Sequence, residues 1–381
     1  MLREHTYAHR ALDVEAALGV TSRHAQTRPK SVVVLGLSIT SSWGNGHATT
    51  YRGLVRALAA RGHEVHFLER DVPWYADNRD LPQPAYCRTS IYRSLSELRD
   101  RFTSLVRDAS VVIVGSYVPE GIEVGDWVLD NARGITAFYD IDTPVTLASL
   151  TAGSCAYLAP EHVRRYRLYL SFTGGPTLDR IERDFGSPHA RALYCSVDPE
   201  LYAPDPQTQR WDLAYMGTYS DDRQPIVQRL LVEPAKRSPS RHFVVAGPQY
   251  PEHLEWPANV ERIEHLGPDH HRAFYNRAAF ALNVTRREMT DCGWSPSVRL
   301  FEAAACGVPI ISDTWRGLDQ LFEPDREILL ARDTEDVMRY LSDISDDKRR
   351  EIGRRGRARV LAEHTPAHRV GELERYLDEV H

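Results

Sequence analysis

The sequence predicts an α/β protein of two Rossmann-like domains, each a parallel sheet covered by helices on both faces. Short apolar, β-rich runs alternate with segments of helical spacing along most of the 381 residues. The polar, proline-containing stretch 196–210 interrupts this alternation and is typical of a linker. A chain of this length also exceeds one ordinary core, which favours two domains.

The first predicted domain opens with SVVVLGLSI (31–39), a run typical of a buried parallel strand. A helix with a terminal glycine is predicted next, at 47–62. Further strands of this domain are predicted at 64–69, 110–116 and 134–140.

The second domain is predicted from a later series of strands and helices and a charged helical tail. The strands are expected at 211–217, 242–247, 261–267, 280–284 and 308–312, the helices at 225–236, 269–278 and 297–306, and the tail at 333–381. The resulting divisions are a leader (1–30), a first domain (31–205), a second domain (206–365) and a C-terminal helix (366–381).

Composition excludes several classes of protein. The net charge of −6 gives no general attraction to nucleic acid, and no apolar run approaches the roughly 20 residues that span a bilayer. The charged run 346–359 nearly lacks aromatic residues and is typical of a solvated helix face. The five cysteines form no C-x-x-C pair, as expected for reduced thiols. We therefore expect a cytoplasmic protein without stable membrane insertion or a nucleic-acid partner; the oligomeric state is not predicted.

The stretch SPSVRLFEAAACGVPIISD (295–313) carries the clearest candidate site. Free amides at a helix start, here 297–300, form an anion site suited to phosphate, with Ser297 as a plausible N-cap. The Glu302 carboxylate is suited to accept hydrogen bonds from a ribose diol. The alternative is a buried helix whose Arg299 and Glu302 form an ion pair at i,i+3.

Several motifs together resemble the GT-B glycosyltransferases, most closely the CgeB-like, spore-maturation-type group. The resemblance lies in LNVTRREM (282–289), GWSPSVRLFEAAACGVPIISD (293–313), WRGLDQLF (315–322), SSWGNGHATTYRGLVRALAARGHEVHFLERD (41–71) and FYDIDTPVTL (138–147). It implies two facing Rossmann-like domains with a cleft between them, and transfer of a sugar from a nucleoside diphosphate donor held by the C-terminal domain. Many retaining members have two glutamates separated by seven residues: Glu302 matches the second, but Trp294 stands at the first.

The donor residues are predicted at strand ends and at this helix. Gly217 allows close backbone approach to a ligand, and the arginines Arg223 and Arg286 are candidates for the diphosphate, although each is also explained as an exposed loop residue. The turn at Leu266 and Gly267 resembles the one that contacts the base. The complete donor set is Gly217, Arg223, Leu266, Gly267, Asn283, Thr285, Arg286, Ser295, Ser297, Val298, Arg299 and Glu302.

The first domain is predicted to hold the reacting and acceptor groups. The loop SSWGNGH joins a strand to a helix but is not G-x-G-x-x-G, because Thr49 stands at the third position. His47 is predicted to contact the diphosphate or act as a base, with a capping or packing role as the alternative. Candidate acceptor or sugar contacts are Trp43, Gly44, Asn45, Gly46, Asp140, Thr143, Thr173 and Gly174.

Asp140 and Asp142 form a literal D-x-D, a motif that holds Mg²⁺ or Mn²⁺ in a different glycosyltransferase fold. In two Rossmann units, helix ends and arginines neutralise phosphate charge, so we expect no metal site. Asp142 is instead predicted to act at the reaction centre, in contact with an acceptor or sugar hydroxyl.

The sequence-based prediction is thus a metal-independent GT-B glycosyltransferase with no cofactor, a UDP- or GDP-sugar donor, an unidentified acceptor and retention favoured over inversion. The alternatives are a nucleotide-sugar epimerase of the same architecture and a non-catalytic nucleotide-sugar-binding protein. A dehydrogenase is disfavoured by the imperfect glycine pattern.

Overall fold

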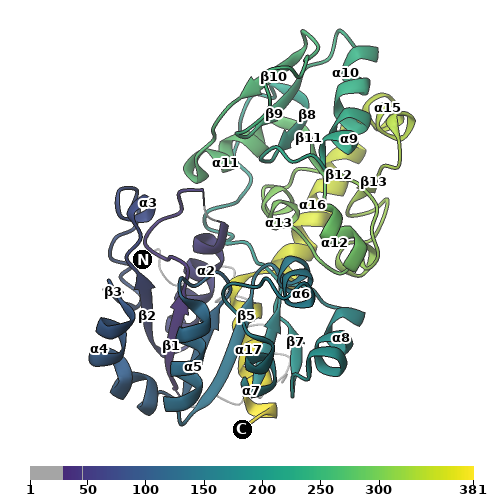
Figure 1. Ribbon diagram of the computed structural model, residues 1–381. Coiled ribbons are helices and arrows are strands. Elements are labelled where there is room, and N and C mark those ends of the chain that lie inside the picture. Colours follow the sequence, from purple (N-terminus) through teal and green to yellow (C-terminus); the bar gives the residue numbers. More distant parts are fainter. Residues whose placement is uncertain (1–28, 45) are drawn as a thin grey trace, which may run out of the picture.

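The first domain is a parallel sheet with strand order β3-β2-β1-β4-β5-β6-β7. It belongs to a computed structural model that describes residues 29–44 and 46–381 (Figure 1). The order of the first six strands is that of a doubly wound Rossmann sheet, and β7 extends it. The elements are β1 (Ser31–Gly36), α2 (Gly46–Ala60), β2 (Glu64–Arg70), α3 (Pro73–Ala76), β3 (Arg88–Tyr92), α4 (Leu95–Asp108), β4 (Val111–Gly115), α5 (Gly121–Asn131), β5 (Ile135–Asp140), α6 (Thr143–Thr151), α7 (Pro160–Arg165), β6 (Leu168–Ser171), α8 (Pro176–Phe185) and β7 (Ala190–Ala192).

The second domain repeats the same order in a parallel sheet, β10-β9-β8-β11-β12-β13. Its elements are β8 (Trp211–Met216), α9 (Gln224–Val227), η1 (Gln228–Val232), α10 (Glu233–Arg237), β9 (Phe243–Ala246), β10 (Val260–Ile263), α11 (Pro268–Asn276), β11 (Ala278–Asn283), α12 (Arg287–Cys292), α13 (Val298–Ala305), β12 (Ile310–Ser312), α14 (Leu318–Leu321) and β13 (Leu329–Leu330). The helices α15 (Thr334–Asp343), α16 (Asp346–Glu363) and α17 (Pro366–Glu379) follow. The predicted fold class, two facing Rossmann-like domains, is confirmed.

Most predicted elements occur within a few residues of their expected bounds, and the differences have local causes. The helix expected at 225–236 is divided into α9, the π-helical turn η1 and α10. Pro234 has no N–H to donate to the preceding turn, which explains the wider turn before it. The strand β3, RTSIY, was not predicted because it is short and mostly polar, and pairing with β2 stabilises it.

The apolar core is arranged by the alternation of side chains along each strand. Val32 and Val34 of β1 face one cluster, whereas Val33 and Leu35 face another on the opposite side of the sheet. The cluster that contains Val32 continues through the interdomain joint into the second domain, as far as Leu300 and Phe301 of α13. The two domains are therefore joined by apolar packing.

The last helix returns to the first domain. α16 and α17 lead the chain back, so that its C-terminal end lies at the bottom of the N-terminal sheet, and α17 packs beside α2 (Figure 1). Arg61 donates to both oxygens of Glu374 at 2.8 and 2.5 Å, and His63 Nε2 lies 2.9 Å from the same carboxylate. Burial opposes ionisation of Glu374, but Arg61 and His63 outweigh it and lower its pKa.

We expect Glu374→Gln to lower the free energy of unfolding by about 1–3 kcal/mol at neutral pH, because it removes the charge from a buried cluster. Since folding lowers the pKa of Glu374, its contribution is present above the unfolded value of about 4.3 and is lost as the pH falls through the folded value. Urea unfolding at pH 7 and pH 4 measures both effects.

The control is Glu379→Gln on the same helix, because Glu379 forms an exposed ion pair with Arg191. This change should cost about 0.5 kcal/mol or less. Equal losses in the two variants would contradict a specific role for the Glu374 cluster.

Candidate functional site

Both sheets change winding direction at the positions where a doubly wound fold binds ligands. In the first domain this switch lies between β1 and β4, and in the second between β8 and β11. A pocket of about 370 Å³ lies between the domains at these strand ends. Its lining comprises Ser42, Gly44, Gly46, Thr49, Tyr202, Met216, Gly217, Thr218, Gly247, Pro248, His265, Leu266, Pro268, His271, Val298, Arg299 and Glu302.

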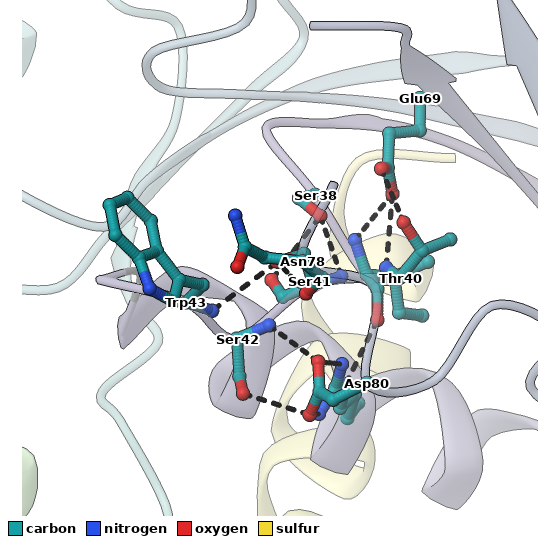
Figure 2. Close-up of polar contacts among 10 residues, drawn as sticks. Ser38, Thr40, Ser41, Ser42, Trp43, Glu69, Asn78 and Asp80 are labelled. Carbon is teal, nitrogen blue, oxygen red and sulfur yellow. Dashed lines mark hydrogen bonds and ion pairs between the residues drawn. The ribbon is translucent and has the colours of Figure 1, made fainter. Parts of the chain in front are cut away.

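The loop between β1 and α2 forms the N-terminal wall of this pocket and is held by two carboxylates (Figure 2). Buried Glu69, at the end of β2, accepts from the amides of Ile39 and Thr40 at 2.7 and 3.1 Å and from the Thr40 hydroxyl at 2.6 Å. Asp80 accepts from both the amide and the hydroxyl of Ser42 at 2.8 Å. The predictions missed both carboxylates, of which Glu69 lies near the end of β2 and Asp80 follows the short helix α3.

Arg52 of α2 completes this arrangement. It donates to both oxygens of Asp80 at 2.8 and 2.9 Å and to the carbonyl of Ile39 at 2.9 Å. Burial opposes ionisation of Asp80, but the bonds from Arg52 and Ser42 outweigh it and hold its pKa well below the usual range. The loop is thus fixed at Ile39, Thr40 and Ser42. Gly44 and Gly46 line the pocket and Trp43 is exposed, whereas Asn45 lies outside the described residues.

Three further side chains of the first domain, those of Tyr117, Asp142 and His47, lie together near this loop, although none of them lines the pocket. The Tyr117 hydroxyl donates to Asp142 Oδ2 at 3.0 Å, and its ring lies edge-on to the His47 ring at 5.4 Å. Arg286 of the second domain lies 3.6 Å from Asp142, which links the domains across the cleft. Burial lowers the pKa of His47 to about 4, so the imidazole is neutral at pH 7, and burial raises the pKa of Asp142.

The other predicted acceptor residues lie inside the protein. Asp140 is fully buried and accepts from Tyr169 at 2.6 Å and Thr146 at 2.7 Å. Thr143 bonds to Ser171 at 2.9 Å. These contacts favour structural roles for Asp140 and Thr143 in place of the predicted sugar contacts.

Thr173 and Gly174 also take part in structure, at the joint between the domains. The Thr173 hydroxyl lies 2.8 Å from that of Ser295, and the Gly174 amide donates to the carbonyl of Trp294 at 2.9 Å. The Trp294 ring packs so closely on Gly175 that a Cβ there would lie 2.4 Å from it. Trp294, which stands where the resemblance led us to look for a glutamate, is therefore part of the interdomain packing.

The start of α13 is fixed by buried polar groups from neighbouring strands. Ser297 occupies the N-cap position, but its hydroxyl donates to Asn283 at 2.9 Å and does not cap the helix. Asp313, after β12, accepts from the amide and hydroxyl of Thr285, both at 2.9 Å. Asn283, Thr285, Ser295 and Ser297 therefore position the helix from inside, and Asp313 is a member of this group that the site predictions missed.

Within the described part of the chain, the amides of Val298 and Arg299 have no backbone or side-chain acceptor, and both residues line the pocket. Free amides at a helix start, together with the helix dipole, favour an anion. The pocket thus has a positive wall at α13.

The three candidate arginines have different environments. Arg299 forms no ion pair or hydrogen bond with any residue that the structure describes, and its buried Nε has no partner. Arg223 is only 7% exposed and donates to Ser220 at 2.8 Å and to the carbonyl of Thr218 at 2.6 Å, so it supports the loop after β8. Arg286 is half-exposed and faces Asp142. Of the three, Arg299 is the cation available to a ligand.

Glu302 faces the pocket from one turn further along α13 and is 4% exposed. Tyr275 donates to its Oε2 at 3.3 Å, and His271 lies 3.9 Å from the same oxygen. Neither carboxylate oxygen contacts Arg299 in the structure, so the alternative of an Arg299–Glu302 ion pair is not observed. Tyr202, which also lines the pocket, is a further hydrogen-bond partner of Glu302.

Glycines allow the backbone to approach closely at the other end of the pocket. Gly247 has φ of 144°, and a Cβ there would lie 2.1 Å from the Gly217 carbonyl. Gly267 is the N-cap of α11, and Leu266 beside it lines the pocket. This end of the pocket offers mostly apolar surface and backbone groups, which suits a planar base.

The D-x-D motif does not present two free carboxylates. Asp140 is committed to Tyr169, Thr146 and the amide of Asp142, and burial raises its pKa to about 6. Among the residues with assigned positions, no three or more His, Cys, Asp or Glu side chains are grouped as metal ligands. Nor does any helix in that part of the chain have the length and apolarity needed to cross a bilayer.

The chain is similar to known proteins both in sequence and in structure. Residues 223–375 match a family described as glycosyl transferase-like. The structure is similar to sucrose-phosphate synthase (tll1590) from Thermosynechococcus elongatus (TM-score 0.64, 15% identity) and to Anabaena Alr3699/HepE in complex with UDP and glucose (TM-score 0.69, 11% identity). It is also similar to an alpha-glucosyltransferase in complex with UDP-glucose and DNA containing an abasic site (TM-score 0.67, 12% identity). Each alignment covers 92% of this chain and 100% of the other. No curated protein matches in sequence.

These likenesses show that the chain has the GT-B fold. The family match and the fold together support nucleotide-sugar-dependent glycosyl transfer.

We expect Arg299→Ala to weaken binding of pyrophosphate by about tenfold or more, because it removes the unpaired cation of the pocket. Isothermal titration with pyrophosphate measures this. Arg223→Ala is the control: it should lower thermal stability, because it leaves the Thr218 carbonyl without its donor, and affect pyrophosphate affinity less. Unchanged affinity in the Arg299 variant would place the anion site elsewhere.

Proposed function

We propose that this protein is a GT-B glycosyltransferase of the CgeB-like group, which transfers a sugar from a nucleoside diphosphate donor to an acceptor hydroxyl. The observation that carries the proposal is the pocket at α13. An unpaired Arg299, free helix-start amides and the Glu302 carboxylate line one cavity between two Rossmann-like domains. A nucleoside diphosphate has complementary groups in the same order: an anionic diphosphate, a diol and a base.

In this proposal the base lies at Leu266 and Gly267, the ribose diol donates to Glu302 and the diphosphate lies at the start of α13. As the bond between the anomeric carbon and the β-phosphate oxygen breaks, negative charge grows on that phosphate. Arg299 and the amides of Val298 and Arg299 stabilise this charge without rearranging, because Asn283 and Asp313 already fix the helix start.

The acceptor is proposed to approach from the first domain. Its hydroxyl oxygen forms the new bond to the anomeric carbon as the bond to the β-phosphate oxygen breaks, and its proton passes to the Asp142 carboxylate, with neutral His47 beside it. Closure of the domains on the donor excludes water and shortens the reacting distance. UDP is the first donor to test, since UDP is bound in several similar structures, and GDP is the second.

Two finer features also belong to this proposal. Retention is favoured, because α13 resembles the helix that carries the second glutamate in retaining members, although Trp294 replaces the first. Metal independence is favoured, because Asp140 is engaged by other side chains of its own domain.

We expect Glu302→Gln to lower the affinity for the nucleoside diphosphate by about tenfold or more, because it weakens charge-assisted hydrogen bonds to the diol. The melting temperature should move little, since Tyr275 can still donate to the amide oxygen. A thermal-shift screen of UDP, GDP, TDP and ADP first identifies the nucleotide, and calorimetry then compares the variant with Glu288→Gln, an exposed carboxylate outside the pocket. A destabilised Glu302 variant with normal nucleotide affinity would reject the ribose role.

We expect turnover to persist in excess EDTA, because the D-x-D motif presents only Asp142 to the cleft. The assay measures release of nucleoside diphosphate and of sugar from the matching nucleotide sugar. Complete loss of activity that Mn²⁺ restores would instead make this motif part of a metal site. The same assay separates the alternatives, since an isomeric nucleotide sugar indicates an epimerase and binding without turnover indicates a non-catalytic protein.

A further inference from the structure

Tyr117 occupies the switch point of the first sheet and lies in none of the motifs that predicted the site. It follows β4 after a single residue, Ser116, opposite the loop that leaves β1. Its φ is 62°, a left-handed conformation that bulky residues rarely adopt. Such strain persists only where the surroundings hold it in place, and it is often found at functional sites.

Local bonds hold the Tyr117 backbone relative to Asp142. The Ser116 amide donates to the carbonyl of Tyr139 at 3.0 Å, and the Ser116 hydroxyl accepts from the amide of Ile141 at 3.1 Å. The ends of β4 and β5 are therefore tied together immediately before Tyr117 and Asp142. The distance between the hydroxyl and the carboxylate is set by the sheet itself.

The Tyr117 side chain contacts both residues predicted to act at the reaction centre. Its hydroxyl donates to Asp142 Oδ2 at 3.0 Å, and its ring packs edge-on against His47 at 5.4 Å. Its other face packs against Tyr157, with ring centroids 4.6 Å apart. Burial and the negative charge of Asp142 raise the pKa of Tyr117, so the phenol stays a donor throughout the neutral range.

From this geometry we propose that Tyr117 is the positioning residue of the acceptor site. It fixes the Asp142 carboxylate through one oxygen and leaves the other oxygen to receive a hydrogen bond from the acceptor hydroxyl, while its ring fixes the orientation of His47. This inference rests on the proposed function, because Asp142 has a reacting partner only if a sugar is transferred.

The charged groups around Asp142 define the expected pH dependence. Tyr117 and Arg286 both favour the ionised carboxylate, whereas burial and Glu288 oppose it. The Asp140 carboxylate accepts a hydrogen bond from the backbone amide of Asp142 and makes no hydrogen bond to the Asp142 carboxylate in the described structure. Removing the phenol hydroxyl takes away one of the two favourable contacts, so the pKa of Asp142 should rise.

Tyr117→Phe is the test, because it keeps the ring against His47 and the same backbone conformation. We expect kcat for UDP-glucose hydrolysis, with water as the acceptor, to fall roughly tenfold at its plateau. We also expect the acidic limb of the pH–rate profile to move to higher pH, whereas the affinity for UDP and the melting temperature should stay close to those of the wild type.

Tyr376→Phe is the control, since the Tyr376 hydroxyl donates to the carbonyl of Ala192 and not to Asp142. It should leave the plateau and the acidic limb in place. A Tyr117→Phe variant with a wild-type pH profile and kcat would overturn the proposal, as would an equal change in Tyr376→Phe.

A measurement without turnover separates this inference from the proposed function. Carboxyl ¹³C NMR titration of Asp142 in the two variants should show a higher pKa in Tyr117→Phe only. If the wild-type chain binds no nucleoside diphosphate and turns over no nucleotide sugar, the proposed function is wrong and the acceptor role falls with it. An unmoved Asp142 pKa in an active enzyme refutes the positioning role alone.

Discussion

The buried bonds among Asn283, Thr285, Ser297 and Asp313 determine where α13 begins and in which direction it points. Asp313 accepts two hydrogen bonds from Thr285. Asn283 accepts a hydrogen bond from the Ser297 hydroxyl, which therefore does not cap the helix. Burying these groups is favourable only because they satisfy one another. As a result, the first amides of α13 stay free and Arg299 and Glu302 project into the same pocket. The anion site, the position of the carboxylate and the interdomain contact at Ser295 all depend on this one arrangement.

The same logic distinguishes side chains that support the site from those that face it. Arg223 and Arg299 have the same chemistry, but Arg223 is bonded to the loop after β8 whereas Arg299 has no partner of its own. Asp140 and Asp142 differ in the same way, because Asp140 is enclosed by its own domain. A charged group whose hydrogen bonds are already made has less to gain from a ligand.

The two halves of the cleft are held by different means. The N-terminal wall is a loop fixed by Glu69, Asp80 and Arg52, and its two pocket-lining glycines are Gly44 in the loop and Gly46 at the start of α2. The C-terminal wall is a helix start. Trp294, packed on Gly175, and the returning helix α17 join the domains on the side away from the pocket. The Asp142–Arg286 contact, at 3.6 Å, is a further link between the domains, and Arg286 is half-exposed there.

The sequence by itself determined the two parallel sheets, because local patterns of apolar residues predict buried strands and amphipathic helices. It also predicted that the start of α13 and Glu302 belong to one site, and both line the same pocket. Tertiary structure alone decided which of several similar residues face the cleft. Arg223, Asp140, Thr143 and Thr173 are enclosed by partners distant in sequence, and Tyr117, Glu69, Asp80 and Asp313 gain their importance from such partners. Hydrogen bonds between strand ends depend on the order of strands in the sheet, and no local pattern in the chain encodes that order.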